Sequence, residues 1–88
     1  MAELIHESSS RLIARDGVTY RAVVMGEQHA DGTWHGWIEF YGVPDGPVRA
    51  TGRETSQSSR GALDYWASGL EPVYYEGAFD RTDTLIAR

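Results

Sequence analysis

The sequence predicts an α+β fold, in which an antiparallel meander of four strands is followed by one helix and then by a fifth strand. Three observations support this prediction. Asp-Gly pairs at 16–17, 31–32 and 45–46 interrupt runs of β-branched and aromatic residues, which is typical of hairpins. Apolar residues then recur at helical spacing between residues 60 and 70. An aromatic run after Pro72 predicts the last strand.

The chain is expected to hold a single domain over residues 11–80, because 88 residues allow only one hydrophobic core. Residues 1–10 are expected to form a loose N-terminal segment, since Ser8-Ser9-Ser10 shows no periodicity and chain ends are usually loose. Residues 81–88 are expected to form a charged C-terminal tail.

The first hairpin is predicted at Asp16-Gly17. A two-residue type I′ loop needs positive φ at both central positions, which Asp-Gly tolerates. This loop sets Ile13 opposite Tyr20 and Arg11 opposite Ala22.

The second hairpin admits two registers, and its hydrophobic pattern favours one of them. A three-residue loop at 30–32 sets Val24 opposite Ile38 and Ala22 opposite Phe40. A two-residue loop would set Val24 opposite Glu39, and a slip of one residue moves every side chain to the other face. We therefore expect the three-residue loop.

The third turn is predicted as another three-residue loop, Pro44-Asp45-Gly46, which sets Phe40 opposite Ala50. The alternation of strand residues then divides the meander into two faces. One face is the expected core, with Ile13, Tyr20, Ala22, Val24, Trp34, Ile38, Phe40, Val48 and Ala50. The second face holds Leu12, Arg21, Val23, Met25, His35, Trp37, Glu39, Tyr41, Arg49, Thr51 and Arg53.

The helix is expected to cover the first face with one apolar stripe, because apolar side chains need partners. Ser56 or Ser58 is the expected N-cap, and Gly69 is placed for a left-handed residue after the last turn. The fifth strand is expected over residues 72–79. The stripe consists of Ala62, Leu63, Trp66, Ala67 and Leu70.

Composition narrows the classes of function. The net charge of −5 divides into −2 for residues 1–10, zero for residues 11–60 and −3 for residues 61–88. This balance argues against nonspecific nucleic-acid binding, which needs a basic field. The absence of cysteine excludes disulfides and thiolate zinc sites. No apolar run is long enough for a membrane span, and we expect a cytoplasmic protein without membrane partners.

Motifs for catalysis and metal binding are weak. His29, Asp31 and His35 flank one turn and suggest a metal site, but no fourth ligand is in sight. Residues 52–56 before the expected helix suggest an anion site, but they lack the spacing of a phosphate loop. Serines occur without a nucleophile elbow. We expect no enzyme, no cofactor and no metal.

The second face predicts an interaction surface. Tryptophan, tyrosine and arginine dominate interface energetics, and one helix cannot cover both faces of the sheet. We expect a homodimer or another protein partner there, although residues 1–10 or Leu85-Ile86 folding over the face is an alternative. Single-stranded nucleic acid stacking on the aromatic residues is the other alternative. The predicted interface residues are Trp37, Tyr41, Met25, Val23, Arg21, Arg49 and Arg53.

The order of strand and turn motifs over residues 20–70 resembles HicB-like antitoxin domains. The motifs are Tyr20-x-Ala22-x-Val24, Asp31-Gly32, Trp37-x-Glu39-Phe40 and Thr51-Gly52, followed by a helix that opens before Ala62-Leu63. The resemblance implies a small sheet with a packed helix, self-association and neutralisation of a small RNA-cleaving toxin. The chain departs from the family in its longer spacing between Gly52 and the helix, and no long DNA-binding segment follows Phe79.

Overall fold

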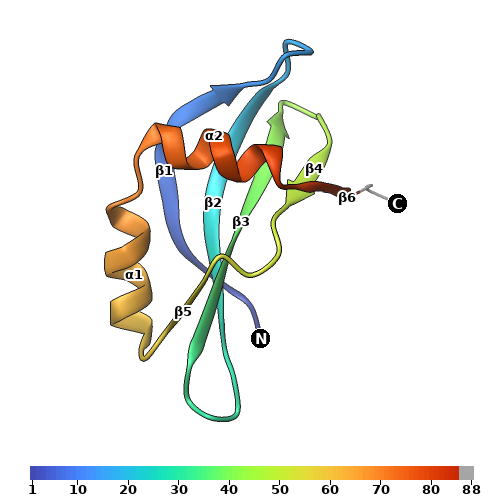
Figure 1. Ribbon diagram of the computed structural model, residues 1–88. Coiled ribbons are helices and arrows are strands. Elements are labelled where there is room, and N and C mark those ends of the chain that lie inside the picture. Colours follow the sequence, from blue (N-terminus) through green and yellow to red (C-terminus); the bar gives the residue numbers. More distant parts are fainter. Residues whose placement is uncertain (86–88) are drawn as a thin grey trace.

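A computed structural model describes residues 1–85, the last three by their backbone alone, and shows an α+β fold (Figure 1). The fold class predicted from the sequence is confirmed, with two helices in place of one. In chain order the elements are β1 (Glu3–Ile13), β2 (Thr19–Gln28), β3 (Trp34–Val43), β4 (Val48–Ala50), β5 (Thr55–Gln57), α1 (Arg60–Ser68), α2 (Pro72–Asp80) and β6 (Asp83–Leu85).

The strands form one antiparallel sheet in the order β1-β2-β3-β4-β6, and β5 also pairs with β3. Because β2 occupies one edge of β3, β4 and β5 share its other edge. Thr51 separates them: its N–H donates to the Ile38 carbonyl at 2.9 Å, and its hydroxyl accepts from the Ile38 N–H at 3.0 Å. The same hydroxyl donates to the Gly52 carbonyl at 2.7 Å. A side-chain oxygen thus replaces one rung of the ladder.

The predicted register of the central hairpin is confirmed. Val24 pairs with Ile38, and Ala22 with Phe40. The loop is Ala30-Asp31-Gly32, in which Gly32 adopts a φ of 90°. This left-handed conformation suits glycine, which lacks the Cβ that would clash there.

The predicted register of the first hairpin was wrong by one residue. Leu12 pairs with Tyr20, and Ile13 with Thr19. The loop has three residues and ends at Gly17 with a φ of 85°, so it repeats the geometry of the second loop. Leu12 therefore packs against the core, whereas Ile13 is 73% exposed.

The predicted register of the third turn was also wrong by one residue. Tyr41 pairs with Val48, and Phe40 with Arg49; the Gly42 N–H donates to the Pro47 carbonyl at 2.9 Å, so the loop holds the four residues 43–46. Gly42 and Gly46 approach so closely that a Cβ on either would lie within 2.8 Å of the other's backbone. Since a slip of one residue exchanges the faces, Val48 and Ala50 leave the helix side and Arg49 joins it.

The prediction of a loose segment over residues 1–10 was wrong for most of its length. Glu3 to Ser10 belong to β1, which pairs with β2 through two irregularities, one between Leu4 and His6 and one between Glu7 and Arg11. The Glu3 carboxylate also binds the Arg60 guanidinium at 2.7 Å. Residues 83–85 of the predicted tail likewise pair, as β6, with β4.

The N-cap of helix α1 differs from both predicted residues, Ser56 and Ser58. Ser59 is the N-cap, and its hydroxyl accepts from the Ala62 N–H at 3.0 Å, while Ser56 lies in β5. Gly69 ends the helix with a φ of −91°, so the predicted left-handed residue does not occur.

Leu63 of α1 sets the distance between helix and sheet. Its side chain is fully buried above Gly26 and Gly36, and a Cβ added to either glycine would lie within 2.7 Å of a Leu63 methyl group. Glycine at both positions therefore lets the helix approach the sheet.

Residues 72–79 form most of α2, so the prediction of a fifth strand there was wrong. Pro72 occupies the start of the helix, where its missing N–H costs nothing. Tyr75 and Ala78 are buried and recur at helical spacing. Phe79 packs 4.8 Å from Tyr20 and 5.2 Å from Phe40, measured between ring centroids. The alternation that predicted a strand was coincidental.

Both helices lie against the same face of the sheet, and the core sits between them (Figure 1). Neither helix is long and apolar enough to cross a membrane, and no other helix occurs in residues 1–85. The core consists of Tyr20, Ala22, Val24, Ile38, Phe40, Ala67, Tyr75 and Ala78.

Leu63→Ala is expected to lower the free energy of unfolding by about 2–5 kcal/mol, because it removes buried methyl groups and leaves a cavity between α1 and the sheet. Urea unfolding followed by circular dichroism measures this loss. Tyr65→Ala, on the same helix but 84% exposed, is the control and should change stability by less than about 0.5 kcal/mol. Equal losses for both variants would contradict the packing of α1 described above.

Candidate interaction surface

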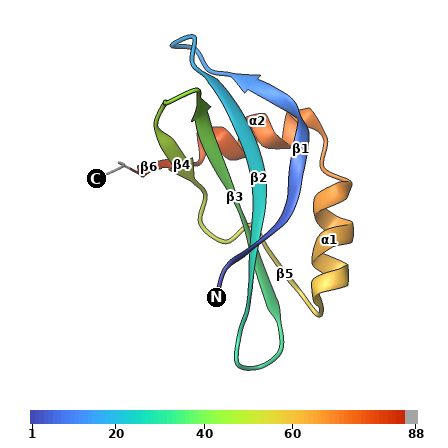
Figure 2. The ribbon, with the colours of Figure 1, turned by 180° about the vertical axis from the view of Figure 1, so that it is seen from behind.

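The face of the sheet that points away from the helices is the candidate site (Figure 2). We call it the open face and define it by the residues that alternate along β2 and β3. Residues 3–13 lie within the sheet as β1, so they do not fold over this face as one alternative required. Ile86 lies outside the described residues. The open face comprises Arg21, Val23, Met25, Trp37, Glu39 and Tyr41.

Glu39 occupies the centre of the open face. One carboxylate oxygen, Oε2, accepts from Trp37 Nε1 at 2.9 Å, and the other, Oε1, accepts from the Tyr41 hydroxyl at 2.5 Å. All three residues share a face because they are two apart on β3. The hydrogen bond to Glu39 and burial raise the pKa of Tyr41 to about 12. Both aromatic side chains are thus tied to one carboxylate.

Arg21 carries the positive charge of the open face, and it contacts both Tyr41 and Glu7. Its guanidinium carbon lies 5.1 Å from the centroid of the Tyr41 ring, within range of a cation–π contact. Its Nη1 lies 3.6 Å from a Glu7 carboxylate oxygen. Acidic and basic groups therefore alternate across β1, β2 and β3.

The apolar part of the open face differs from the predicted patch. Val23 pairs with Glu7 on one side and with Glu39 on the other, and it is only 3% exposed. It therefore adds almost no accessible apolar surface to the open face. Met25 and Trp37 pair directly and remain partly exposed.

Sequence reasoning missed three apolar residues on this side: Leu4 pairs with Met25, Val48 with Tyr41, and Ala50 with Glu39. The sequence carried no signal for the last two, because the close approach of Gly42 and Gly46 at the third loop is seen only in the structure.

Arg49 was predicted on this face and lies on the other. Its guanidinium carbon sits 4.6 Å from the centroid of the Phe79 ring, and its Nε donates to the Thr82 hydroxyl at 2.7 Å. Nη2 also donates to the Thr82 carbonyl at 3.3 Å. Arg53 is exposed in the turn between β4 and β5, beyond the ladder. The structure thus brings together five of the seven predicted residues: Arg21, Val23, Met25, Trp37 and Tyr41.

The histidines beside the second turn stack against each other. The ring centroids of His29 and His35 are 3.6 Å apart, and burial together with the His29 charge lowers the pKa of His35. The Asp31 carboxylate accepts from the Thr33 hydroxyl at 2.7 Å and from the Thr33 N–H at 3.0 Å. These hydrogen bonds lower the pKa of Asp31. No cluster suited to a metal ion occurs among the described residues.

The suggested anion site at residues 52–56 has no helix N-terminus, because this segment leads into β5. Its acidic residue Glu54 instead braces α2. Glu54 Oε1 accepts from the Tyr74 hydroxyl and from Arg81 Nη2, both at 2.6 Å. The Glu54 side chain is 10% exposed, and burial alone would raise its pKa. Hydrogen bonds from Arg81 and Tyr74 outweigh burial and lower it.

Glu54→Gln is expected to lower the free energy of unfolding by about 1–2 kcal/mol at pH 7, because the hydrogen bonds from Tyr74 and Arg81 lose their charged acceptor. The loss is limited because the Arg81 side chain is half exposed, so water screens its charge. A pKa below the ordinary 4.5 means that the folded state binds fewer protons. The contribution of Glu54 is therefore complete above pH 4.5 and is lost as pH falls through the folded-state pKa. Urea unfolding at pH 7 and below pH 4 measures the difference between the two proteins, with exposed Glu76→Gln as control. A difference that does not shrink as pH falls would contradict these hydrogen bonds of Glu54.

No protein-family model matches the chain, and neither a curated protein nor a solved structure matches it. The resemblance to HicB-like antitoxin domains therefore stays a prediction.

Proposed function

We propose that the chain is a small non-enzymatic interaction module that self-associates through its open face. The observation that carries this proposal is the partly exposed pair Met25 and Trp37, next to Tyr41, on a sheet face that no helix of residues 1–85 crosses. Aromatic residues, methionine and arginine are the types enriched at protein interfaces. The HicB-like resemblance implies the same property, because that family self-associates.

The charges of the open face favour a second copy as the partner. In a dimer with a two-fold axis, the same patch of both copies meets at the interface. A patch with a large net charge would therefore repel the equal charge of the other copy. Here Arg21 is matched by Glu7, which leaves Glu39 as the one unmatched charge of the open face, and both of its oxygens already accept hydrogen bonds within the same copy. In a dimer, Arg21 of one copy can also pair with Glu7 of the other.

The same arrangement disfavours single-stranded nucleic acid. Bases stack on aromatic rings beside a positive groove that follows the phosphates. On the open face, Trp37 and Tyr41 hold a carboxylate between them, and Arg49 points to the helix side. Arg21 is the basic residue that remains beside the aromatic pair, and Glu7 accompanies it.

Trp37→Glu is expected to convert a dimer into a folded monomer, because it places a charge in the centre of the apolar contact. A central aromatic residue contributes about 2 kcal/mol or more, so the dissociation constant should rise at least about thirtyfold. Sedimentation equilibrium measures it, and circular dichroism checks the fold. Tyr65→Glu, on the exposed side of α1, should leave the dimer intact.

A wild type that stays monomeric at high micromolar concentration would refute self-association. Short single-stranded oligonucleotides are then titrated at low salt. Quenching of tryptophan fluorescence that weakens with added salt would establish the nucleic-acid alternative in its place.

A further inference from the structure

Met25 is the one sulfur-bearing residue in the interior of the sequence. The chain holds no cysteine and two methionines, of which the other is Met1 at the N-terminus. Met25 lies in β2, and its side chain is partly exposed on the open face. A partly exposed thioether is a common target of oxidation, which converts it to a sulfoxide. An oxidant therefore meets this sulfur on the same surface that we assign to self-association.

The neighbours of Met25 form an apolar row across three strands. Met25 pairs with Leu4 of β1 on one side and with Trp37 of β3 on the other. Directly opposite side chains of an antiparallel pair point to the same face, with their Cβ atoms about 4.5–5.5 Å apart. Leu4 is 52% exposed, and Met25 and Trp37 are partly exposed. Met25 thus lies in the middle of an apolar contact that the open face offers to a second copy.

The hydrogen-bond donors of the open face are either engaged already or far from the Met25 sulfur. The Trp37 Nε1–H and the Tyr41 hydroxyl both donate to Glu39. Arg21 lies four residues along β2, about 13 Å away. A second copy presents the same engaged donors. A sulfoxide oxygen on Met25 would therefore be hydrated in the monomer and unpaired in the dimer, and burial of an unpaired polar group is unfavourable.

We propose that Met25 is a modification site, and that its oxidation to the sulfoxide weakens the self-association of the chain; this rests on the proposed function, because the surface is the same. Hydrogen peroxide is a sufficient oxidant. The sulfur lone pair takes one oxygen atom of the peroxide, the O–O bond breaks, and the second oxygen leaves as water. The sulfur loses two electrons and the peroxide gains them. Methionine sulfoxide reductase reverses the change with two thiols, which become a disulfide while the oxygen leaves as water.

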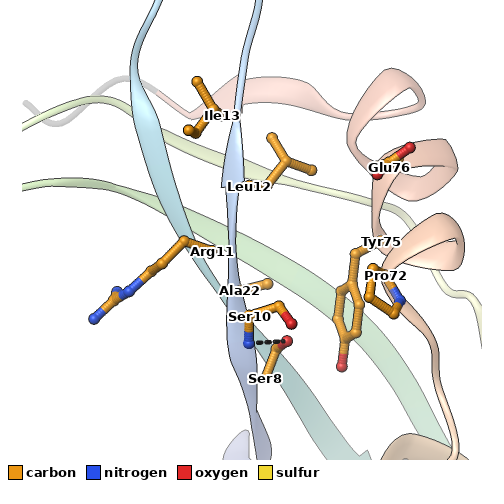
Figure 3. Close-up of a pocket in the computed structure, with 9 residues that line it drawn as sticks. All are labelled: Ser8, Ser10, Arg11, Leu12, Ile13, Ala22, Pro72, Tyr75 and Glu76. Atoms are coloured by element: carbon orange, nitrogen blue, oxygen red, sulfur yellow. Dashed lines mark hydrogen bonds between the residues drawn. The ribbon is translucent and has the colours of Figure 1, made fainter.

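The packing of the helices on the sheet involves no sulfur, so oxidation should leave it intact. A cavity of about 130 Å³ between β1 and α2 is lined by hydroxyl, carboxylate, guanidinium and hydrocarbon groups (Figure 3). The core on the same side of the sheet consists of aromatic and aliphatic side chains. The expected product of oxidation is therefore a folded chain with an altered open face.

The first test measures how fast hydrogen peroxide oxidises Met25 at several protein concentrations. Peptide mass spectrometry follows the sulfoxide, and N-acetylmethionine in the same tube is the standard for the reagent. A second copy that covers Met25 slows the reaction, so its rate relative to the standard should fall as the protein dimerises. A relative rate that stays constant while sedimentation shows a dimer would place Met25 outside the interface and overturn the proposal.

The second test compares dissociation constants before and after complete oxidation, by sedimentation equilibrium. The oxidised wild type should dimerise at least about tenfold more weakly, the effect of one unpaired polar group. Methionine sulfoxide reductase with dithiothreitol should restore the original value. Met25→Leu cannot form the sulfoxide, so its dissociation constant should be the same before and after peroxide. This variant also controls for oxidation of Met1.

An oxidised wild type that dimerises as tightly as before overturns the proposal and leaves self-association standing. An untreated wild type that is monomeric at high micromolar concentration refutes self-association, and the role of Met25 falls with it. Equal weakening of Met25→Leu by peroxide would assign the effect to another residue and overturn the proposal. Loss of the circular dichroism spectrum on oxidation would overturn it too, because the dimer would then be lost through unfolding.

Discussion

The pairing of β2 with β3 is the constraint on which the rest of the molecule depends. It sets Val24 against Ile38 and Ala22 against Phe40 on the helix side. It also brings Gly26 opposite Gly36, and this pair of glycines admits Leu63. A slip of one residue would move the side chains of one strand to the opposite face, and Gly26 and Gly36 would no longer lie together beneath Leu63 of α1. Gly32, in the left-handed conformation, sets the loop length that prevents this slip.

The central hairpin could be predicted from the sequence because only one register groups its apolar residues. The neighbouring turns lack this contrast. Leu12 and Ile13 are both apolar, so either can face the core. Beyond the third turn, Arg49 stands between two apolar residues, and its aliphatic stem and planar head pack against Phe79, so a charged side chain faces the helices. Pattern alone could not choose these registers.

The two ends of the chain were harder to predict for different reasons. β1 bulges between Glu7 and Arg11, which destroys the period of two that marks a strand. In α2, adjacent aromatic residues favour a strand by propensity, whereas tertiary packing of Tyr75 and Phe79 imposes a helix. Of the candidate interface, sequence placed Trp37, Glu39 and Tyr41 on one side. It could not show that Glu39 binds both aromatic residues, because that depends on rotamers.

Thr51 also makes the two edges of the sheet unequal. The hydroxyl that replaces a main-chain rung divides the far side of β3 into two strands of three residues each, β4 and β5. Such short strands are poor templates for a neighbouring chain, whereas β1 extends over 11 residues. The β1 edge is therefore the better template for a strand of another chain. If two copies paired through β1, each would have used its one long edge, so pairing of this kind would stop at two copies and would not build a filament.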